Sequence, residues 1–154
     1  MYHKIKIILH LDIKAIRLLL EAYFYLGWVR CQLLCRSFSK IAPSLGVYMK
    51  ETALEESQEL NADLKKIRHS IKIMSKYTHW DSKCLVRAIA AMKMLERRKI
   101  NSTLYLGTGK DENGKMIAHA WLRSGSLYVT GYEEMHRFTV SGMFAKVTSI
   151  VGEE

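Results

Sequence analysis

The feature that most constrains the fold of this chain is a change in the spacing of its apolar residues near residue 100. Before this point, apolar side chains recur every three or four positions, which is the period of an amphipathic helix. After it, short runs rich in β-branched and aromatic residues are separated by turn signals, of which Asp-Glu-Asn-Gly at 111–114 is the strongest. A chain with helices first and strands afterwards is expected to form an α+β fold, with N-terminal helices followed by an antiparallel sheet.

Three helices are predicted in the first part of the chain. The first spans about 12–39 and is apolar nearly all round, and the second spans about 61–78; each starts at an Asp or Asn that can cap it. The third is expected to begin after a cap at Asp81 or Ser82, which places Cys84 in its first turn. The acidic stretch between the first two helices is expected to be a solvated connection or the polar start of the second helix.

The second part of the chain predicts short strands. They are expected at 103–106, at 116–123 and at 127–130, with one more short strand at 138–140. Consecutive strands joined by tight turns pair with their neighbours in sequence, so we expect a simple antiparallel meander.

Length and composition favour one domain over residues 1–154, with 1–50 as a helical N-terminal part. A chain of this size can bury enough surface to fold without disulfides or metal. Its three cysteines are an odd number, which favours a reducing compartment, and we expect a cytoplasmic protein. Cys31 and Cys35 share one helix face and are expected to be buried, structural thiols.

The formal net charge of +9 raises the question of an anionic partner. The basic residues are spread along the chain and match no nucleic-acid-binding motif, so we expect no nucleic acid partner. The apolar run at 16–29 is too short to span a bilayer and contains Arg17 and Glu21. Peripheral contact of this first helix with a membrane surface stays open.

Cys84 and His119 are the candidate catalytic pair. A thiol at the start of a helix feels the positive end of the macrodipole, which favours thiolate over thiol. A histidine beside it could act first as base and then as acid. Trp80 and Trp121 flank the two residues in sequence and are expected to line the site. Without further context, a buried cysteine and a hydrogen-bonded core histidine would be the simpler interpretation.

The sequence around these residues resembles the transglutaminase-like leader peptidases of lasso-peptide biosynthesis. The resemblance is strong from residue 80 onward and weaker in the helical part. It is carried by Trp80-Asp81-Ser82-Lys83-Cys84-Leu85-Val86-Arg87-Ala88, Leu104-Tyr105-Leu106-Gly107, Ala118-His119-Ala120-Trp121-Leu122 and Tyr128-Val129-Thr130-Gly131.

The resemblance implies a papain-like, transglutaminase-like core and a stand-alone cysteine peptidase. Cys84 would attack the bond between leader and core of a ribosomally made precursor, with His119 as acid and base. The implied partners are the precursor leader peptide, a small leader-recognition protein and an ATP-dependent lasso cyclase. Neither a cofactor nor a metal is implied.

The sequence departs from the family pattern at the third catalytic group. The family usually places an acid on the strand after the histidine, whereas the expected register puts Thr130 or Gly131 opposite His119. Glu133, Glu134, the Thr130 hydroxyl or a backbone carbonyl could orient the imidazole instead. A missing acid would slow the reaction without abolishing it, because that group tunes the tautomer and charge of the histidine.

A second hypothesis belongs to another class: a non-catalytic peptide- or partner-binding module on the same fold. The basic surface and the apolar first helix would then serve docking. A transglutaminase proper would need a lysine donor substrate and is disfavoured by the small size of the chain.

Overall fold

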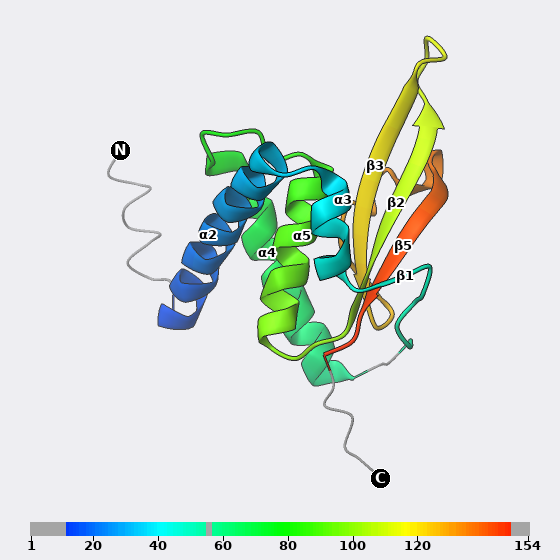
Figure 1. Ribbon diagram of the computed structural model, residues 1–154. Helices are drawn as coiled ribbons and strands as arrows, with labels where there is room; N and C mark the ends of the chain where they lie inside the picture. The colour runs from blue at the N-terminus through cyan, green and yellow to red at the C-terminus, as the bar shows by residue number, and fades with distance from the viewer. Residues whose placement is uncertain (1–11, 55–56, 149–154) are drawn as a thin grey trace.

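The computed structural model describes residues 12–54 and 57–148, and it shows helices gathered on one side of an antiparallel sheet (Figure 1). The predicted α+β fold, with helices first and strands afterwards, is confirmed. The elements are α2 (Ile13–Cys35), α3 (Phe38–Ile41), the 3-10 turn η1 (Ala42–Leu45), β1 (Val47–Tyr48), α4 (Gln58–Tyr77), α5 (Cys84–Arg97), β2 (Ser102–Lys110), β3 (Met116–Ser124), β4 (Leu127–Thr130), the 3-10 turn η2 (Met135–Arg137) and β5 (Thr139–Lys146).

Helix α2 starts where the sequence predicts and ends earlier. The Asp12 side chain accepts a hydrogen bond from the backbone N–H of Lys14, as an N-cap does. The helix ends at Cys35 instead of about residue 39, because Arg36 adopts an extended conformation and the chain then turns into the short α3.

Helix α5 begins at Cys84, so the expectation that Asp81 or Ser82 caps it is wrong. The N-cap is Lys83, and its side chain makes no capping hydrogen bond. Both expected caps have other partners. The Asp81 carboxylate pairs with Lys83 Nζ at 3.2 Å, and the Ser82 hydroxyl lies 2.8 Å from that of Thr78.

Helix α4 begins three residues before its expected cap, since Ser57 and not Asn61 precedes its first turn. Its end near Tyr77 agrees with the prediction. Its inner face buries Leu64, Ile67 and Ile71.

The core lies between α5, its neighbouring helices and one face of the sheet. Helix α5 packs against both α2 and α4 on one side and against β3, β2 and β4 on the other. Small residues on α5 allow this close approach, because an alanine adds little height to a helix surface. The fully buried side chains of α5 include Ala88, Ala90, Ala91, Met92, Met94 and Leu95.

The sheet has the strand order β1-β5-β2-β3-β4. Strands β2, β3 and β4 form the predicted meander, but the simple meander is wrong for the last strand. Strand β5 returns to the other side of β2 and extends to Lys146, beyond the expected 138–140. The short β1, expected as part of a solvated connection, pairs with β5 at the edge.

The two faces of the sheet have different surroundings. Leu104 and Leu122 are paired across β2 and β3 and lie in the core with the helices. Their neighbours Tyr105 and Trp121 are also paired and point to the opposite face, because side chains alternate along a strand. This outer face carries His119 as well, two residues before Trp121.

The two cysteines of α2 lie on the surface of the protein. Cys31 and Cys35 are exposed free thiols, so the prediction that they are buried is wrong; a helix that is apolar on all sides does not reveal which side faces the core. Within the described residues, no helix is long and apolar enough to cross a membrane.

Candidate functional site

Cys84 is the first residue of α5 and is half-buried. Its side chain packs against the edge of the hydrophobic core. The backbone N–H groups of a first helical turn have no partner inside the helix, so they can stabilise negative charge next to this thiol. The prediction that Cys84 lies in the first turn of a helix is confirmed.

His119 lies in β3, opposite Gly107 of β2, and is 8% exposed. Its Nε2 lies 2.7 Å from the backbone carbonyl oxygen of Gly131. A carbonyl oxygen can only accept a hydrogen bond, so Nε2 carries the proton. In the neutral ring, Nδ1 is then the unprotonated nitrogen and the one that can act as a base.

Aromatic rings fix the plane of the His119 imidazole. The ring stacks on Trp121, with centroids 5.9 Å apart, and on Phe138, with centroids 4.9 Å apart. Gly107 leaves room for this cluster, since a Cβ at that position would lie 2.7 Å from the Trp121 ring. Trp121, which the sequence predicts to line the site, is thus a neighbour of His119, whereas no sequence signal pointed to Phe138.

The orienting group of His119 is the Gly131 carbonyl. Thr130 pairs with Leu122, not with His119 as the expected register would have it, and its buried hydroxyl has no hydrogen-bond partner in the described structure. Glu133 and Glu134 are exposed, and no hydrogen bond or ion pair joins either of them to His119 among the residues described. A backbone carbonyl was one of the alternatives that the sequence left open.

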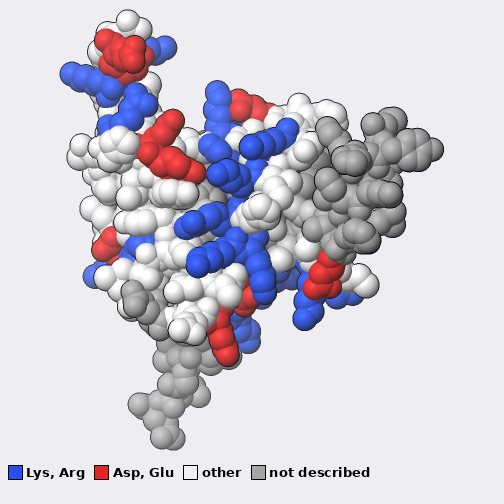
Figure 2. Space-filling view, turned by 180° about the vertical axis from the view of Figure 1, so that it is seen from behind, with Lys and Arg blue, Asp and Glu red and all other residues white. Residues whose placement is uncertain are grey.

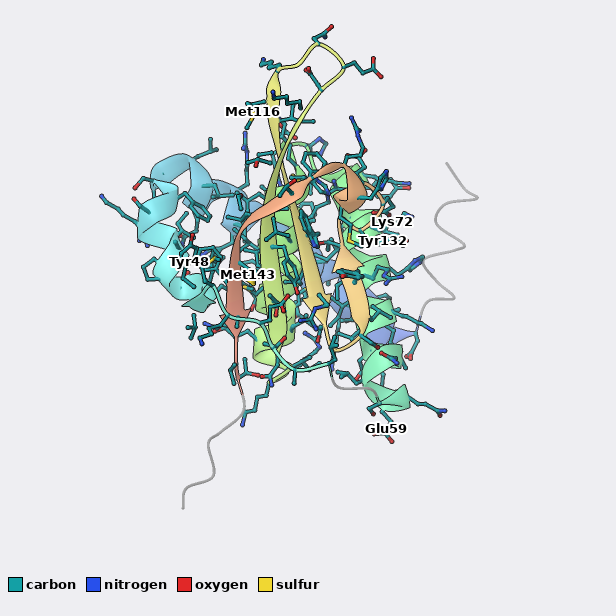
Figure 3. The ribbon with its side chains drawn as sticks, turned by 90° about the vertical axis from the view of Figure 1, so that its right-hand side faces the viewer. Tyr48, Glu59, Lys72, Met116, Tyr132 and Met143 are labelled. Atoms are coloured by element: carbon teal, nitrogen blue, oxygen red, sulfur yellow. The ribbon has the colours of Figure 1, made fainter. Side chains whose placement is uncertain are left out.

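Gly131 is held in place by contacts on both sides of it. Arg68 of α4 donates a hydrogen bond to the carbonyl of Tyr128, and its guanidinium lies 4.9 Å from the centre of the Tyr132 ring. Figure 3 shows Tyr132 on the α4 side of the sheet, in the same region as Lys72. The chain around Gly131 is therefore anchored to α4, which keeps its carbonyl beside the histidine.

Cys84 and His119 approach β3 from different sides. Ala120 and Leu122 point toward the helices and the core, so the alternating His119 points to the outer face, while Cys84 packs on the helix side. Both α5 and β3 begin at the same end of the molecule (Figure 1). Over residues 12–54 and 57–148, no hydrogen bond joins the two side chains.

Trp80 packs against α2. Its ring lies 5.1 Å from that of Tyr23 and directly over Gly27, where a Cβ would come within 3.1 Å of the indole. This contact fixes the segment that leads into α5. Trp80 therefore supports the start of the cysteine helix, and in the described structure it makes no ring contact with His119 or Trp121.

A buried polar network adjoins the histidine on the outer face, and sequence reasoning missed it. Arg123, 5% exposed, donates from Nε to the Tyr105 hydroxyl at 2.9 Å and from an η nitrogen to the Thr52 carbonyl at 3.0 Å. The Tyr105 hydroxyl donates to Glu51. Burial and this bond to Glu51 raise the pKa of Tyr105 to about 12, against the lowering effect of Arg123. The network holds the chain after β1 against the sheet.

The surface seen from behind carries a band of lysine and arginine side chains (Figure 2). Helix α4 lies on this side of the molecule, and its sequence supplies Lys65, Lys66, Arg68, Lys72 and Lys76.

In the described parts of the chain, no three His, Cys, Asp or Glu side chains gather closely enough to bind a metal ion.

Comparison with known families identifies the fold. The family model described as the transglutaminase-like superfamily matches residues 26–142, a range that includes Cys84, His119 and Gly131. Comparison with curated proteins and with solved structures found no match. The matched region covers more than half of the chain, and it contains both the helix that starts with a cysteine and the sheet that carries the histidine. The chain therefore belongs to the transglutaminase-like superfamily.

Proposed function

We propose that this chain is a cysteine endopeptidase that removes the leader from a ribosomally made lasso-peptide precursor. The observation that carries the proposal is the hydrogen bond from His119 Nε2 to the Gly131 carbonyl, because it leaves Nδ1 as the basic nitrogen of the ring. Superfamily membership and the position of Cys84 at the start of α5 support the same chemistry.

The reaction would be acyl transfer to water. His119 Nδ1 first takes the proton of the Cys84 thiol, which leaves a thiolate and an imidazolium. The thiolate attacks the carbonyl carbon of the bond between leader and core, and the electron pair of that C=O moves onto oxygen, where the first-turn amides of α5 can stabilise it. When the C–N bond breaks, the protonated His119 gives its proton to the departing core amine. His119 then takes a proton from water, which attacks the thioester and releases the leader carboxylate and the thiolate.

The mechanism requires the Cys84 sulfur and His119 Nδ1 to come within hydrogen-bonding distance. They are not bonded to each other in the described structure, and catalytic hydrogen bonds are often long before a substrate binds.

The proposed partners are the precursor leader peptide, a small leader-recognition protein and an ATP-dependent lasso cyclase, all acting in the cytoplasm. The basic band on the α4 side would favour acidic segments of such partners. No cofactor takes part in this mechanism.

A second candidate function is a non-catalytic peptide- or partner-binding module on the same fold. The lack of a hydrogen bond between Cys84 and His119 in the described structure favours it, as does the carbonyl in place of an acid beside the histidine. In this case the basic band would bind the partner and Cys84 would be a packing residue.

Cleavage of a precursor by variants tests the first candidate. Purified wild type, Cys84→Ala and His119→Ala would be incubated with a precursor peptide and its recognition protein, and the products followed by mass spectrometry. We expect Cys84→Ala to lose cleavage and Cys31→Ala, which removes an exposed thiol far along α2, to retain it. Cleavage by Cys84→Ala would refute the peptidase.

Thiol labelling separates the two candidates without a substrate. A catalytic Cys84 should react with iodoacetamide below neutral pH faster than Cys31 or Cys35, although those two thiols are more exposed. Peptide mapping after brief labelling measures the three rates. Equal, slow labelling of all three would support the binding module.

A further inference from the structure

We propose that α2 docks this protein onto an anionic membrane surface through an apolar stripe along its outer side. From Ile13 to Trp28 its members recur at intervals of seven or four residues and so share one side of the helix. Leu34 lies six residues further on, near the end of α2, and every member of the stripe is exposed to solvent. The docking stripe consists of Ile13 (67% exposed), Leu20 (64%), Phe24 (63%), Trp28 (40%) and Leu34 (68%).

The packing of the fold does not account for the docking stripe. The opposite side of α2 already supplies Ala22, Leu26 and Val29 to the core, each at most 1% exposed. Exposed apolar side chains gathered on one side of a helix mark an interaction surface. Its aromatic members suit a membrane interface, where indole and phenyl rings lie between headgroups and acyl chains.

Charge identifies the occupant of the docking stripe. Lys14, Arg17 and Arg30 lie along the same helix, and Glu21, the one acidic residue of α2, is held by two hydrogen bonds from Arg98. A second copy of this chain would bring like charges together at such a surface. An anionic bilayer accommodates both the apolar side chains and the cations around them.

A hollow beside Trp28 adds a place for a lipid headgroup. It has a volume of about 200 Å³ and lies between α2, α3 and α5. Ile41 and Ile89 contribute apolar wall, and the exposed Arg36 and Lys40 contribute positive charge. An apolar wall next to two cations fits a phosphate-bearing headgroup and the first part of its acyl chain.

The geometry supports a helix that lies on the membrane and does not cross it. The inner side of α2 is occupied by the protein core, so only the outer side can enter the interface. A helix that lies in the plane of the interface enters the boundary between headgroups and acyl chains by roughly 5–10 Å.

Vesicle binding tests the apolar part of the proposal. The chain of residues 1–154 would be sedimented with vesicles of phosphatidylcholine alone and of phosphatidylcholine mixed with phosphatidylglycerol. We expect binding to the mixed vesicles, weakened about tenfold by Phe24→Ser, since one phenyl side chain would no longer be buried. Met116→Ser is the matched control: Met116 is 62% exposed and lies on the β2–β3 hairpin, which projects away from the helices (Figure 3).

A pair of charge variants tests the electrostatic part. Arg36→Glu/Lys40→Glu removes the cations of the hollow, and Lys72→Glu/Lys76→Glu changes the net charge equally on α4. At physiological ionic strength, screening confines each effect to nearby lipid headgroups. Each basic residue near the membrane surface contributes about 1 kcal/mol to binding, so we expect Arg36→Glu/Lys40→Glu to lose at least about tenfold in affinity for mixed vesicles. We expect Lys72→Glu/Lys76→Glu to lose less than about twofold.

Any one of four results would overturn the proposal. In the first two, the protein fails to bind mixed vesicles, or Phe24→Ser and Met116→Ser lose equal vesicle affinity. In the other two, the two charge variants lose equal vesicle affinity, or sedimentation shows a dimer that Phe24→Ser dissociates. The Cys84→Ala variant should bind vesicles like the wild type, so the outcome does not depend on peptidase activity.

Discussion

At the scale of single residues, Gly131 combines two properties that decide how His119 is held. Its φ of +71° lies in the left-handed region, and a Cβ there would come within 2.5 Å of the Ala120 carbonyl oxygen. Its own carbonyl accepts the hydrogen bond from His119. A residue with a side chain would have to shift this backbone, and the acceptor would move with it.

Replacing Gly131 with alanine should therefore destabilise the protein by more than backbone strain alone. Gly114→Ala is the matched control, because Gly114 has a similar φ of +76° and an added methyl group there would meet nothing within 4 Å. We expect a loss of about 1 kcal/mol for Gly114→Ala and of about 2–4 kcal/mol for Gly131→Ala. Urea denaturation measures both, and equal losses would contradict the close contact.

The residues of the site differ in how far the sequence could predict them. The place of Cys84 in a first helical turn follows from local spacing, and the structure confirms it. The orienting group could not be identified, since a main-chain carbonyl has no residue-type signature. The exposure of Cys31 could not be predicted either, because α2 is apolar on both its inner and outer sides.

At the scale of elements, a partly buried ion pair joins α2 to the end of α5. Two guanidinium nitrogens of Arg98 donate to the two carboxylate oxygens of Glu21, at 2.8 and 2.7 Å. The Glu21 side chain is 11% exposed. The hydrogen bonds to Glu21 raise the pKa of Arg98 above its usual value, so the guanidinium keeps its positive charge.

Arg98→Met should cost about 1.5–3 kcal/mol of unfolding free energy, because the Glu21 carboxylate would lose both of its charged donors. Arg97→Met is the control. The Arg97 side chain is 68% exposed, and its guanidinium comes no closer than 3.9 Å to the same carboxylate. Its loss should therefore cost less than about 1 kcal/mol. A double-mutant cycle with Glu21→Gln measures the coupling, and coupling no larger for Arg98 than for Arg97 would disprove the assignment.

The elements were predictable where their signals are local. The helices and the β2–β3–β4 meander follow from periodicity and turn residues, and they appear with shifted ends. Strands β1 and β5 pair across almost a hundred residues of chain. Such pairing depends on where the helices place the two segments, which a local pattern does not contain.

At the scale of the whole molecule, Glu96 connects the helical layer to the sheet. Its carboxylate accepts from Lys93 of α5 at 2.9 Å and from Lys146 of β5 at 2.8 Å. Burial alone would raise the pKa of Glu96, but the bonds from Lys146 and Lys93 outweigh burial and lower it. The carboxylate therefore stabilises the fold at pH values above its ordinary pKa. This contribution is lost as the pH falls through the lowered pKa of the folded protein.

Glu96→Gln should thus destabilise the protein at neutral pH and lose its effect in acid. The difference in unfolding midpoint between wild type and variant is expected to be constant above about pH 5 and to shrink toward zero below about pH 4. Thermal unfolding followed by circular dichroism over this range measures it. The exposed Glu134→Gln serves as control, and a difference that persists in acid would show that charge is not the cause.

The carbonyl that orients His119 also determines how this contact can be probed. An alanine scan from residue 130 to residue 134 would leave the main-chain acceptor of His119 in place. Such a scan would therefore miss the group that aligns the imidazole ring. Replacing the amide between Gly131 and Tyr132 with an ester would keep the geometry and weaken the oxygen as an acceptor. Chemical synthesis of the backbone, more than mutagenesis, is therefore the means of loosening this imidazole selectively.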